Sequence, residues 1–107
     1  MVLKIYWTDF AKQELQGIFD YYKHRAGLNI ARKLVSGISE VVLSLSTQPN
    51  VGQKEELLAN RFEEFRYLVY KNYKIIYWIN SEQRRVEIVD VFDTRQNPVK
   101  MKRSEKI

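Results

Sequence analysis

The fold of this chain is decided by the stretch FRYLVYKNYKIIYWINSEQRRVEIVDVFDTR, residues 65–95. It holds three runs of alternating aromatic, aliphatic and basic residues, at 65–70, 73–79 and 85–92, and each run has the length of a β-strand. Because successive strand residues point to opposite faces, we predict a sheet that buries one face and presents Arg66, Lys74 and Arg95 together on the other. Such a basic surface can receive phosphate groups or an acidic protein segment.

The first half of the chain predicts a short strand followed by two amphipathic helices. Residues 2–7 alternate as a strand does. Thr8 stands at the N-cap position of the first helix, which Gly27 ends, and Asn29 is placed to cap the second, which stops before Pro49. The apolar residues of each helix repeat at the spacing of one helical face. They are Ala11, Leu15, Ile18, Phe19, Tyr22 and Ala26, then Ala31, Leu34, Val35, Ile38, Val41, Val42 and Leu45.

Two helices joined by a few residues pack antiparallel as a helical hairpin, and the sheet supplies the partner for their apolar faces. The predicted fold is therefore α+β in the order β-α-α-β-β-β, an antiparallel sheet with a helical hairpin packed on one face. Leu57 and Leu58 are expected to anchor the acidic segment 53–64 to the core. We expect a tight turn at Lys71-Asn72, with Asn72 in the left-handed conformation. Residues 86–92 are apolar on both faces, which indicates a central strand.

The length of 107 residues fits one domain, which we assign to residues 1–98, followed by a basic C-terminal tail at 99–107. The formal net charge is +5. From Arg95 onward there are five basic residues and one acid, so most of the excess charge lies at the C-terminal end. A basic tail favours an anionic partner.

The composition excludes several classes of site. There is no cysteine, and His24 is the only histidine, so we expect no disulfide, no metal site and no cofactor. The N-terminus has no signal-peptide pattern, and no run approaches the roughly 20 apolar residues of a membrane span. We therefore expect a cytoplasmic protein without a membrane partner.

With these features in view, the chain resembles the RelE/ParE superfamily of toxins from bacterial type II toxin–antitoxin systems. The resemblance extends from Leu3 to about Pro98, and the order and spacing of its parts make it specific. The matching residues are Ala11, Leu15, Ile18, Tyr22 and Ala31; Leu45, Pro49, Gly52 and Leu57; Phe65-Arg66 and Tyr73-Lys74-Ile75-Ile76-Tyr77; and Val86, Ile88, Val91 and Arg95.

The resemblance implies a growth-inhibiting toxin of the kind associated with plasmid stabilisation, and a cognate antitoxin that wraps and neutralises it. RelE-like toxins cut messenger RNA in the ribosomal A site, whereas ParE-like toxins bind DNA gyrase and block it. The pattern Ile18-x-x-Tyr21-Tyr22 and the ending Leu45-x-x-x-Pro49-x-x-Gly52 look more like ParE-type chains, and the basic tail fits that branch.

The two branches assign the same basic residues differently. In the RelE-like alternative, a metal-independent mRNA endoribonuclease, Arg66, Lys74 and Arg95 would be catalytic. RelE-like toxins often place a tyrosine or histidine near the C-terminus for proton transfer, and no tyrosine or histidine follows Tyr77 here. Whether the protein is an enzyme therefore stays open. In the favoured ParE-like reading, the residues that bind the target are Arg66, Lys74, Arg95, Lys100, Lys102 and Arg103.

A hypothesis from a different functional class is that the chain is a stand-alone RNA-binding module. β-Sheets with basic and aromatic faces bind single strands, so the predicted sheet is compatible with this function.

Overall fold

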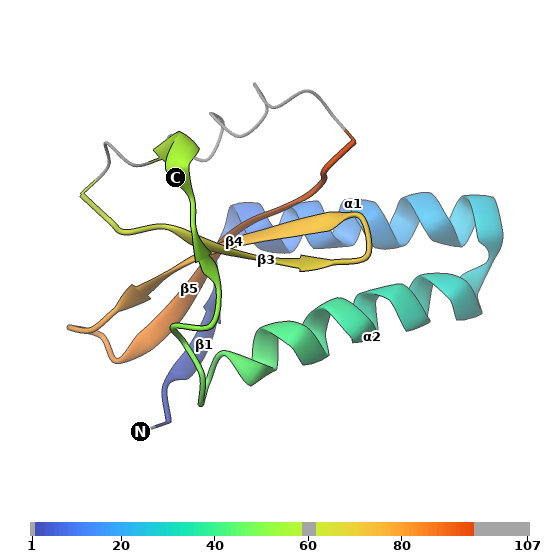
Figure 1. The fold of residues 1–107 in the computed structure, drawn as a ribbon. Coiled ribbons are helices and arrows are strands. Elements are labelled where there is room, and N and C mark those ends of the chain that lie inside the picture. The colour runs from blue at the N-terminus through green and yellow to red at the C-terminus, as the bar shows by residue number, and fades with distance from the viewer. Residues whose placement is uncertain (1, 59–61, 96–107) are drawn as a thin grey trace.

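A computed structural model of the chain describes residues 2–58 and 62–95, without the side chain of Leu57. The sheet contains β1 (Lys4–Trp7), β2 (Gln53–Lys54), β3 (Arg66–Tyr70), β4 (Tyr73–Asn80) and β5 (Arg85–Asp93), in the spatial order β1-β5-β4-β3-β2. Two helices, α1 (Asp9–Ala26) and α2 (Leu28–Ser44), form a hairpin on one face, and the short 3-10 helix η1 (Glu56–Leu58) follows β2 (Figure 1). This arrangement confirms the predicted α+β fold and its element order.

The pairing of the strands adds two features that the sequence did not predict. β1 pairs with β5 in parallel, while the other neighbours pair antiparallel, so the sheet is mostly antiparallel. The two-residue strand β2 extends the sheet beyond β3. β5 lies between β1 and β4 and is buried from Val86 to Phe92, which confirms that it is an interior strand.

The ends of α1 follow the predicted signals. The Thr8 hydroxyl accepts a hydrogen bond from the Ala11 N–H at 3.2 Å and donates one to the Ile88 carbonyl at 2.9 Å, which ties the start of the helix to β5. Gly27 ends α1 with a φ of 102°, a conformation that glycine adopts readily.

Two predictions about single residues are wrong. Asn29 does not cap α2, because the chain turns at Gly27 alone and α2 begins directly at Leu28. In the β3–β4 turn the left-handed residue is Lys71, with a φ of 55°, rather than Asn72. The turn itself lies where it was predicted, between Tyr70 and Tyr73.

Each face of the sheet has its own apolar cluster. On the helix face, side chains from α1, α2, β4 and β5 pack together, as the periodicity of both helices predicts. On the opposite face, which we call the open face, a smaller cluster forms around Ile76, Val89 and Phe92. Leu58 and Phe65 join this second cluster, and Leu58 is 1% exposed, so it anchors the acidic segment as predicted. The side chain of Leu57 and the tail at 99–107 lie outside the described residues.

No helix in the described ranges is long and apolar enough to cross a membrane.

The loop between α2 and β2 is held by a buried tyrosine. The Tyr77 hydroxyl donates to the Pro49 carbonyl at 2.8 Å and accepts from the Gly52 N–H at 2.9 Å. A Cβ at Gly52 would meet the Tyr77 hydroxyl and lie 2.7 Å from the Tyr67 carbonyl oxygen. The loop therefore requires glycine at this position.

We expect Gly52→Ala to lower the free energy of unfolding by roughly 1–3 kcal/mol, because the added methyl group meets backbone of β3 that cannot move aside. Gly17→Ala is the matched control. A Cβ at Gly17, inside α1, meets nothing within 4 Å, so this change should stabilise the helix by up to about 1 kcal/mol. Urea unfolding measures both variants. A Gly52→Ala variant as stable as the wild type would contradict the close approach.

Candidate functional site

The three basic residues singled out from the sequence do not share a surface. In the register of β3 and β4, Arg66 lies opposite Tyr77, whose side chain belongs to the helix-face cluster. Lys74 lies opposite Phe92, a member of the open-face cluster. Arg95 follows the end of β5 and lines a cleft against α1. The expectation of one common cationic surface is therefore wrong, because the strand register sends Arg66 and Lys74 to opposite faces.

Arg66 holds the loop that leads into β2. Its Nη1 donates to the carbonyl oxygens of Gly52 at 2.9 Å and Asn50 at 3.5 Å, and its Nη2 lies 3.4 Å from a carboxylate oxygen of Glu64. The side chain is only 19% exposed. Burial raises the pKa of the neighbouring Tyr77, although the Gly52 hydrogen bond and the Arg66 charge oppose the shift. We therefore assign Arg66 to holding this loop.

Lys74 forms a largely buried ion pair. Its Nζ lies 2.6 Å from Oε2 of Glu55, and the side chains are 19% and 4% exposed respectively. The same ammonium group sits 4.0 Å from the centre of the Tyr67 ring, within cation–π range. Because a carboxylate and an aromatic ring already surround this charge, a phosphate group would have to displace Glu55 to reach it.

Arg95 is the most accessible of the three, with 70% of its side chain exposed, but Asp93 binds it closely. Its Nη2 lies 2.6 Å from Oδ2 of Asp93 and its Nε 3.0 Å from Oδ1. The Arg95 backbone N–H also donates to Oδ1 at 2.8 Å. The Arg95 guanidinium holds the pKa of Asp93 well below its usual range, so the carboxylate is ionised at neutral pH and the pair is neutral overall.

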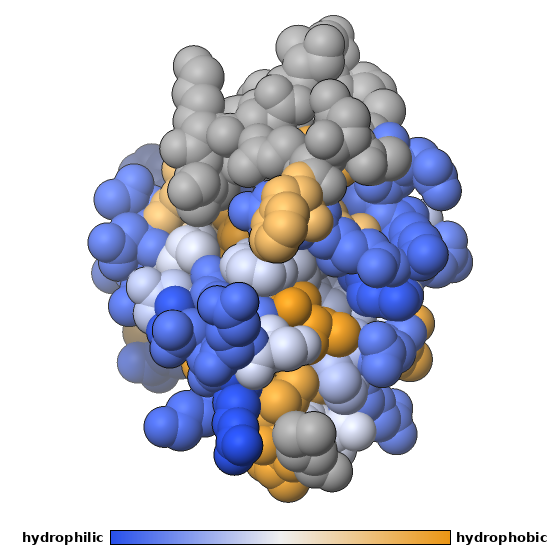
Figure 2. Space-filling view, turned by 90° about the vertical axis from the view of Figure 1, so that its left-hand side faces the viewer, coloured by the Kyte–Doolittle hydropathy of each residue, from blue (hydrophilic) through white to orange (hydrophobic). Residues whose placement is uncertain are grey.

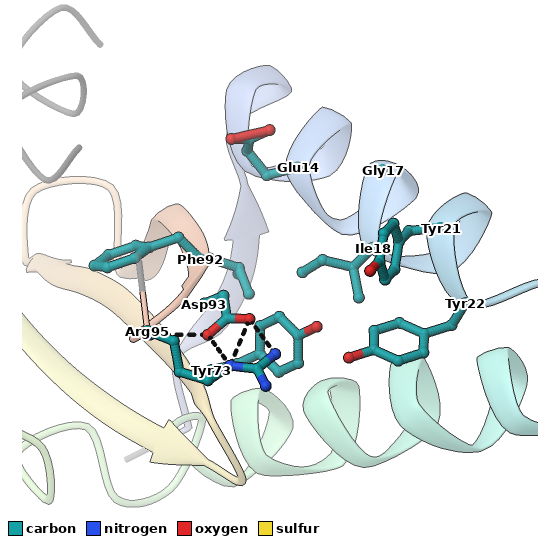
Figure 3. Close-up of a pocket in the computed structure, with 10 residues that line it drawn as sticks. Glu14, Gly17, Ile18, Tyr21, Tyr22, Tyr73, Phe92, Asp93 and Arg95 are labelled. Atoms are coloured by element: carbon teal, nitrogen blue, oxygen red, sulfur yellow. Dashed lines mark hydrogen bonds and ion pairs between the residues drawn. The ribbon is translucent and has the colours of Figure 1, made fainter. Parts of the chain in front are cut away.

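Beside Arg95, tyrosines from α1 and β4 line a cleft of about 450 Å³ (Figure 3). Tyr21 and Tyr22 come from α1, and Tyr73 comes from the start of β4. The pKa of Tyr73 is raised, first by burial and then by the adjacent Tyr22 hydroxyl. Tyr73 therefore stays protonated at neutral pH and offers a hydrogen bond rather than a base. From the sequence, Tyr22 was assigned to the core, and no motif indicated that these tyrosines meet.

Two further observations bear on the chemistry of the site. Within the described ranges, no group of three or more His, Cys, Asp or Glu side chains is placed to hold a metal ion. The predicted target-binding residues Lys100, Lys102 and Arg103 lie outside the part of the chain that the structure describes.

Comparison with known proteins gives a family and a fold. The family model for the ParE toxin of the type II toxin–antitoxin system parDE matches residues 5–98. No curated protein sequence matches significantly. Among solved structures, the chain is similar to the chromosomal ParDE toxin–antitoxin system of P. aeruginosa, with 21% identity, a TM-score of 0.70, and coverage of 86% of this chain and 96% of the other.

Two other solved structures share the fold at lower similarity. The RelBE2 toxin–antitoxin complex of Mycobacterium tuberculosis is 18% identical, with a TM-score of 0.63 and coverage of 87% of this chain and 99% of the other. The E. coli toxin RelE in the free state, as a mutant with two arginines replaced by alanine, is 14% identical. Its TM-score is 0.55, with coverage of 100% of this chain and 99% of the other. At these identities the likeness concerns the fold alone.

We expect Lys74→Met to destabilise the protein by roughly 3 kcal/mol, because it removes the cation that lies 2.6 Å from the buried Glu55 carboxylate. Lys54→Met is the matched control. Lys54 also pairs with a glutamate, Glu64 at 3.2 Å, but the two side chains are 66% and 59% exposed. Loss of that surface pair should cost no more than about 1 kcal/mol. Equal losses for the two variants in chemical unfolding would show that Lys74 is not part of a buried pair.

The Asp93–Arg95 pair predicts a pH dependence. The pKa of Asp93 is depressed in the folded protein, so its stabilising effect is present above the ordinary carboxyl pKa of about 4 and fades as the pH falls below it. We expect Asp93→Asn to be less stable than the wild type at pH 7, and the difference to shrink towards pH 2. Urea unfolding of both proteins across this range measures it. A difference that stays constant with pH would contradict the ion pair.

Proposed function

The chain belongs to the ParE toxin family of type II toxin–antitoxin systems, and from that premise we propose that it arrests growth by binding and inhibiting DNA gyrase, without cleaving RNA. The observation that carries this proposal is the internal pairing of the three basic residues expected at a cleavage site. Arg66, Lys74 and Arg95 each contact a carboxylate of the same chain, and they do not lie on one surface.

RNA cleavage without a metal ion requires positive charge on the phosphorane oxygens and groups that accept and donate protons. The internal pairs leave little free positive charge for the first requirement. For the second, Asp93 is a weak base because its pKa is depressed, and Tyr73 is held in its protonated form by its raised pKa. Both arguments favour inhibition by binding over catalysis.

The second candidate function is ribosome-dependent cleavage of messenger RNA, as in RelE-like toxins. One feature favours it. Arg95 is 70% exposed and borders the cleft with Tyr21, Tyr22 and Tyr73, where a nucleotide base could stack. For this function to hold, a substrate phosphate would have to compete with Asp93 for the guanidinium.

We also propose that a cognate antitoxin binds and neutralises this toxin. Family membership supports this partner, as do the P. aeruginosa ParDE system and the M. tuberculosis RelBE2 complex, in which a similar fold occurs in a toxin–antitoxin pair. Co-expression of the neighbouring antitoxin gene should then restore the growth that expression of this chain alone prevents.

We further propose that four basic residues at the C-terminal end contact the target. They are Arg95, Lys100, Lys102 and Arg103. The excess positive charge of the sequence gathers there, whereas residues 1–94 carry 13 basic and 12 acidic residues. A concentrated positive charge accelerates association with an anionic partner such as the gyrase–DNA complex. Arg66 and Lys74 are left out of this set, because they hold the loops that precede β3.

The purified protein should inhibit supercoiling by gyrase and leave ribosome-bound messenger RNA intact in a parallel translation assay. A truncated chain that ends at Pro98 should need at least about tenfold more protein for the same inhibition, because it lacks the steering charge of the tail. As a control, thermal unfolding of the truncated chain should show that it is still folded. Cleavage of ribosome-bound messenger RNA with gyrase unaffected would establish the RelE-like alternative instead.

A further inference from the structure

A groove opens at the end of the sheet opposite the Arg95 cleft. It lies where the N-terminal residues, the loop after α2 and the β4–β5 turn meet, and its volume is about 610 Å³. Leu3, Pro49 and Ile79 form the apolar part of its lining. Figure 2 shows this end of the molecule, where apolar side chains reach the surface between hydrophilic flanks.

The apolar character continues beside the groove. Val2 and Val51, which adjoin the lining residues Leu3 and Asn50 in sequence, are 74% and 57% exposed. Single exposed apolar residues need no explanation, but apolar residues gathered around a cavity with a polar rim are typical of a protein-binding site.

Arg84 on the rim supplies an available positive charge. It ends the β4–β5 turn in the left-handed conformation, with a φ of 53°. Its backbone is fixed by hydrogen bonds from its N–H to the Ser81 carbonyl and from the Lys4 N–H to its own carbonyl, both at 3.2 Å. Its side chain is exposed, and no hydrogen bond or ion pair joins its guanidinium to any residue in the described ranges.

The neighbouring arginines differ in this respect. Arg85 contacts Glu87 at 2.9 Å and stacks over the Tyr6 ring, and Arg66 donates to backbone carbonyls. Among the described residues that line this groove, Arg84 is therefore the cation that a partner can engage without first breaking an internal contact.

The lining favours a protein segment over a nucleic acid. Binding to a phosphate backbone requires many cations, but among the described lining residues Arg84 alone offers an unpaired guanidinium, and it lies beside an apolar surface. An apolar side chain that enters between Leu3, Pro49 and Ile79, with a carboxylate beside it for Arg84, satisfies both parts of the lining.

We propose that this groove docks a segment of the toxin's protein target in which an apolar side chain lies next to an acidic one, and that Arg84 determines this recognition. The inference rests on the proposed function, because it takes gyrase as the target. It adds a contact at the end of β4 opposite Arg95.

The test compares two substitutions of the same kind at the two ends of β4. Arg84→Asn removes the guanidinium and suits the left-handed turn, since asparagine adopts that conformation readily. Lys71→Asn is the matched control, because Lys71 is an exposed cation with a φ of 55° in the β3–β4 turn. Ser81→Glu serves as a second variant, which places a negative charge on the rim without altering Arg84.

Purified gyrase is titrated against each immobilised variant, and inhibition of supercoiling is measured in parallel. We expect Arg84→Asn and Ser81→Glu to weaken both binding and inhibition by at least about tenfold, because arginine is among the residues that most often carry the binding energy of an interface. Lys71→Asn should match the wild type. Thermal unfolding confirms that each variant is folded.

Full inhibition by both groove variants, while the wild type inhibits gyrase, would overturn the groove and leave the proposed function intact. A wild type without effect on gyrase would overturn both. Loss of binding to duplex DNA alone in Arg84→Asn would assign the groove to nucleic acid and overturn the protein segment. If light scattering showed a dimer for the wild type and a monomer for Arg84→Asn, the groove would bind a second copy of the chain. This outcome would also overturn the proposed protein segment.

Discussion

The register between β3 and β4 is the constraint on which the functional surface of this protein depends. The two-residue turn at Lys71-Asn72 pairs Tyr70 with Tyr73, and every later pair follows from that one. Because strand side chains alternate between faces, this pairing sends Arg66 towards the helices and Lys74 to the open face. A shift by one residue would exchange the two faces of β3 and expose Leu68, which packs against the helix-face core.

This arrangement explains why the segment between α2 and β3 is acidic. Glu55 meets Lys74 on the open face, and Glu64 meets both Arg66 and Lys54. These carboxylates compensate charges that the strand register places near the core, and a buried cation without such a partner would be costly. The charges of residues 1–94 are nearly balanced, and the excess lies in the C-terminal part of the sequence.

Features that depend on neighbours in sequence could be predicted, and those that depend on distant pairing could not. The helices follow from their apolar periodicity, Thr8 caps α1 through a contact three residues away, and the β3–β4 turn has a local signal. The parallel pairing of β1 with β5 joins residues about eighty positions apart, for which a single sequence carries no signal. The partner of Lys74 could not be predicted either, because Glu55 is one of several glutamates in a segment without a regular pattern. The prediction of a common cationic surface was wrong for the same reason, because it depended on a strand register that only the assembled sheet defines.

The two ends of β4 now have different chemical characters. One end carries the Asp93–Arg95 pair and the tyrosine cleft, and the other carries the apolar groove with Arg84. A strand of eight residues at about 3.4 Å each separates them by roughly 25 Å, so a single short peptide that covers one end leaves the other exposed. The proposed target, gyrase, is large enough to contact both ends at once, and weak contacts at two ends of a rigid sheet would combine into a tight complex. An antitoxin that blocks only one end would then lower the affinity of the toxin for its target without abolishing it. Complete neutralisation therefore requires an antitoxin long enough to reach both ends, or one that sterically excludes the target from the sheet.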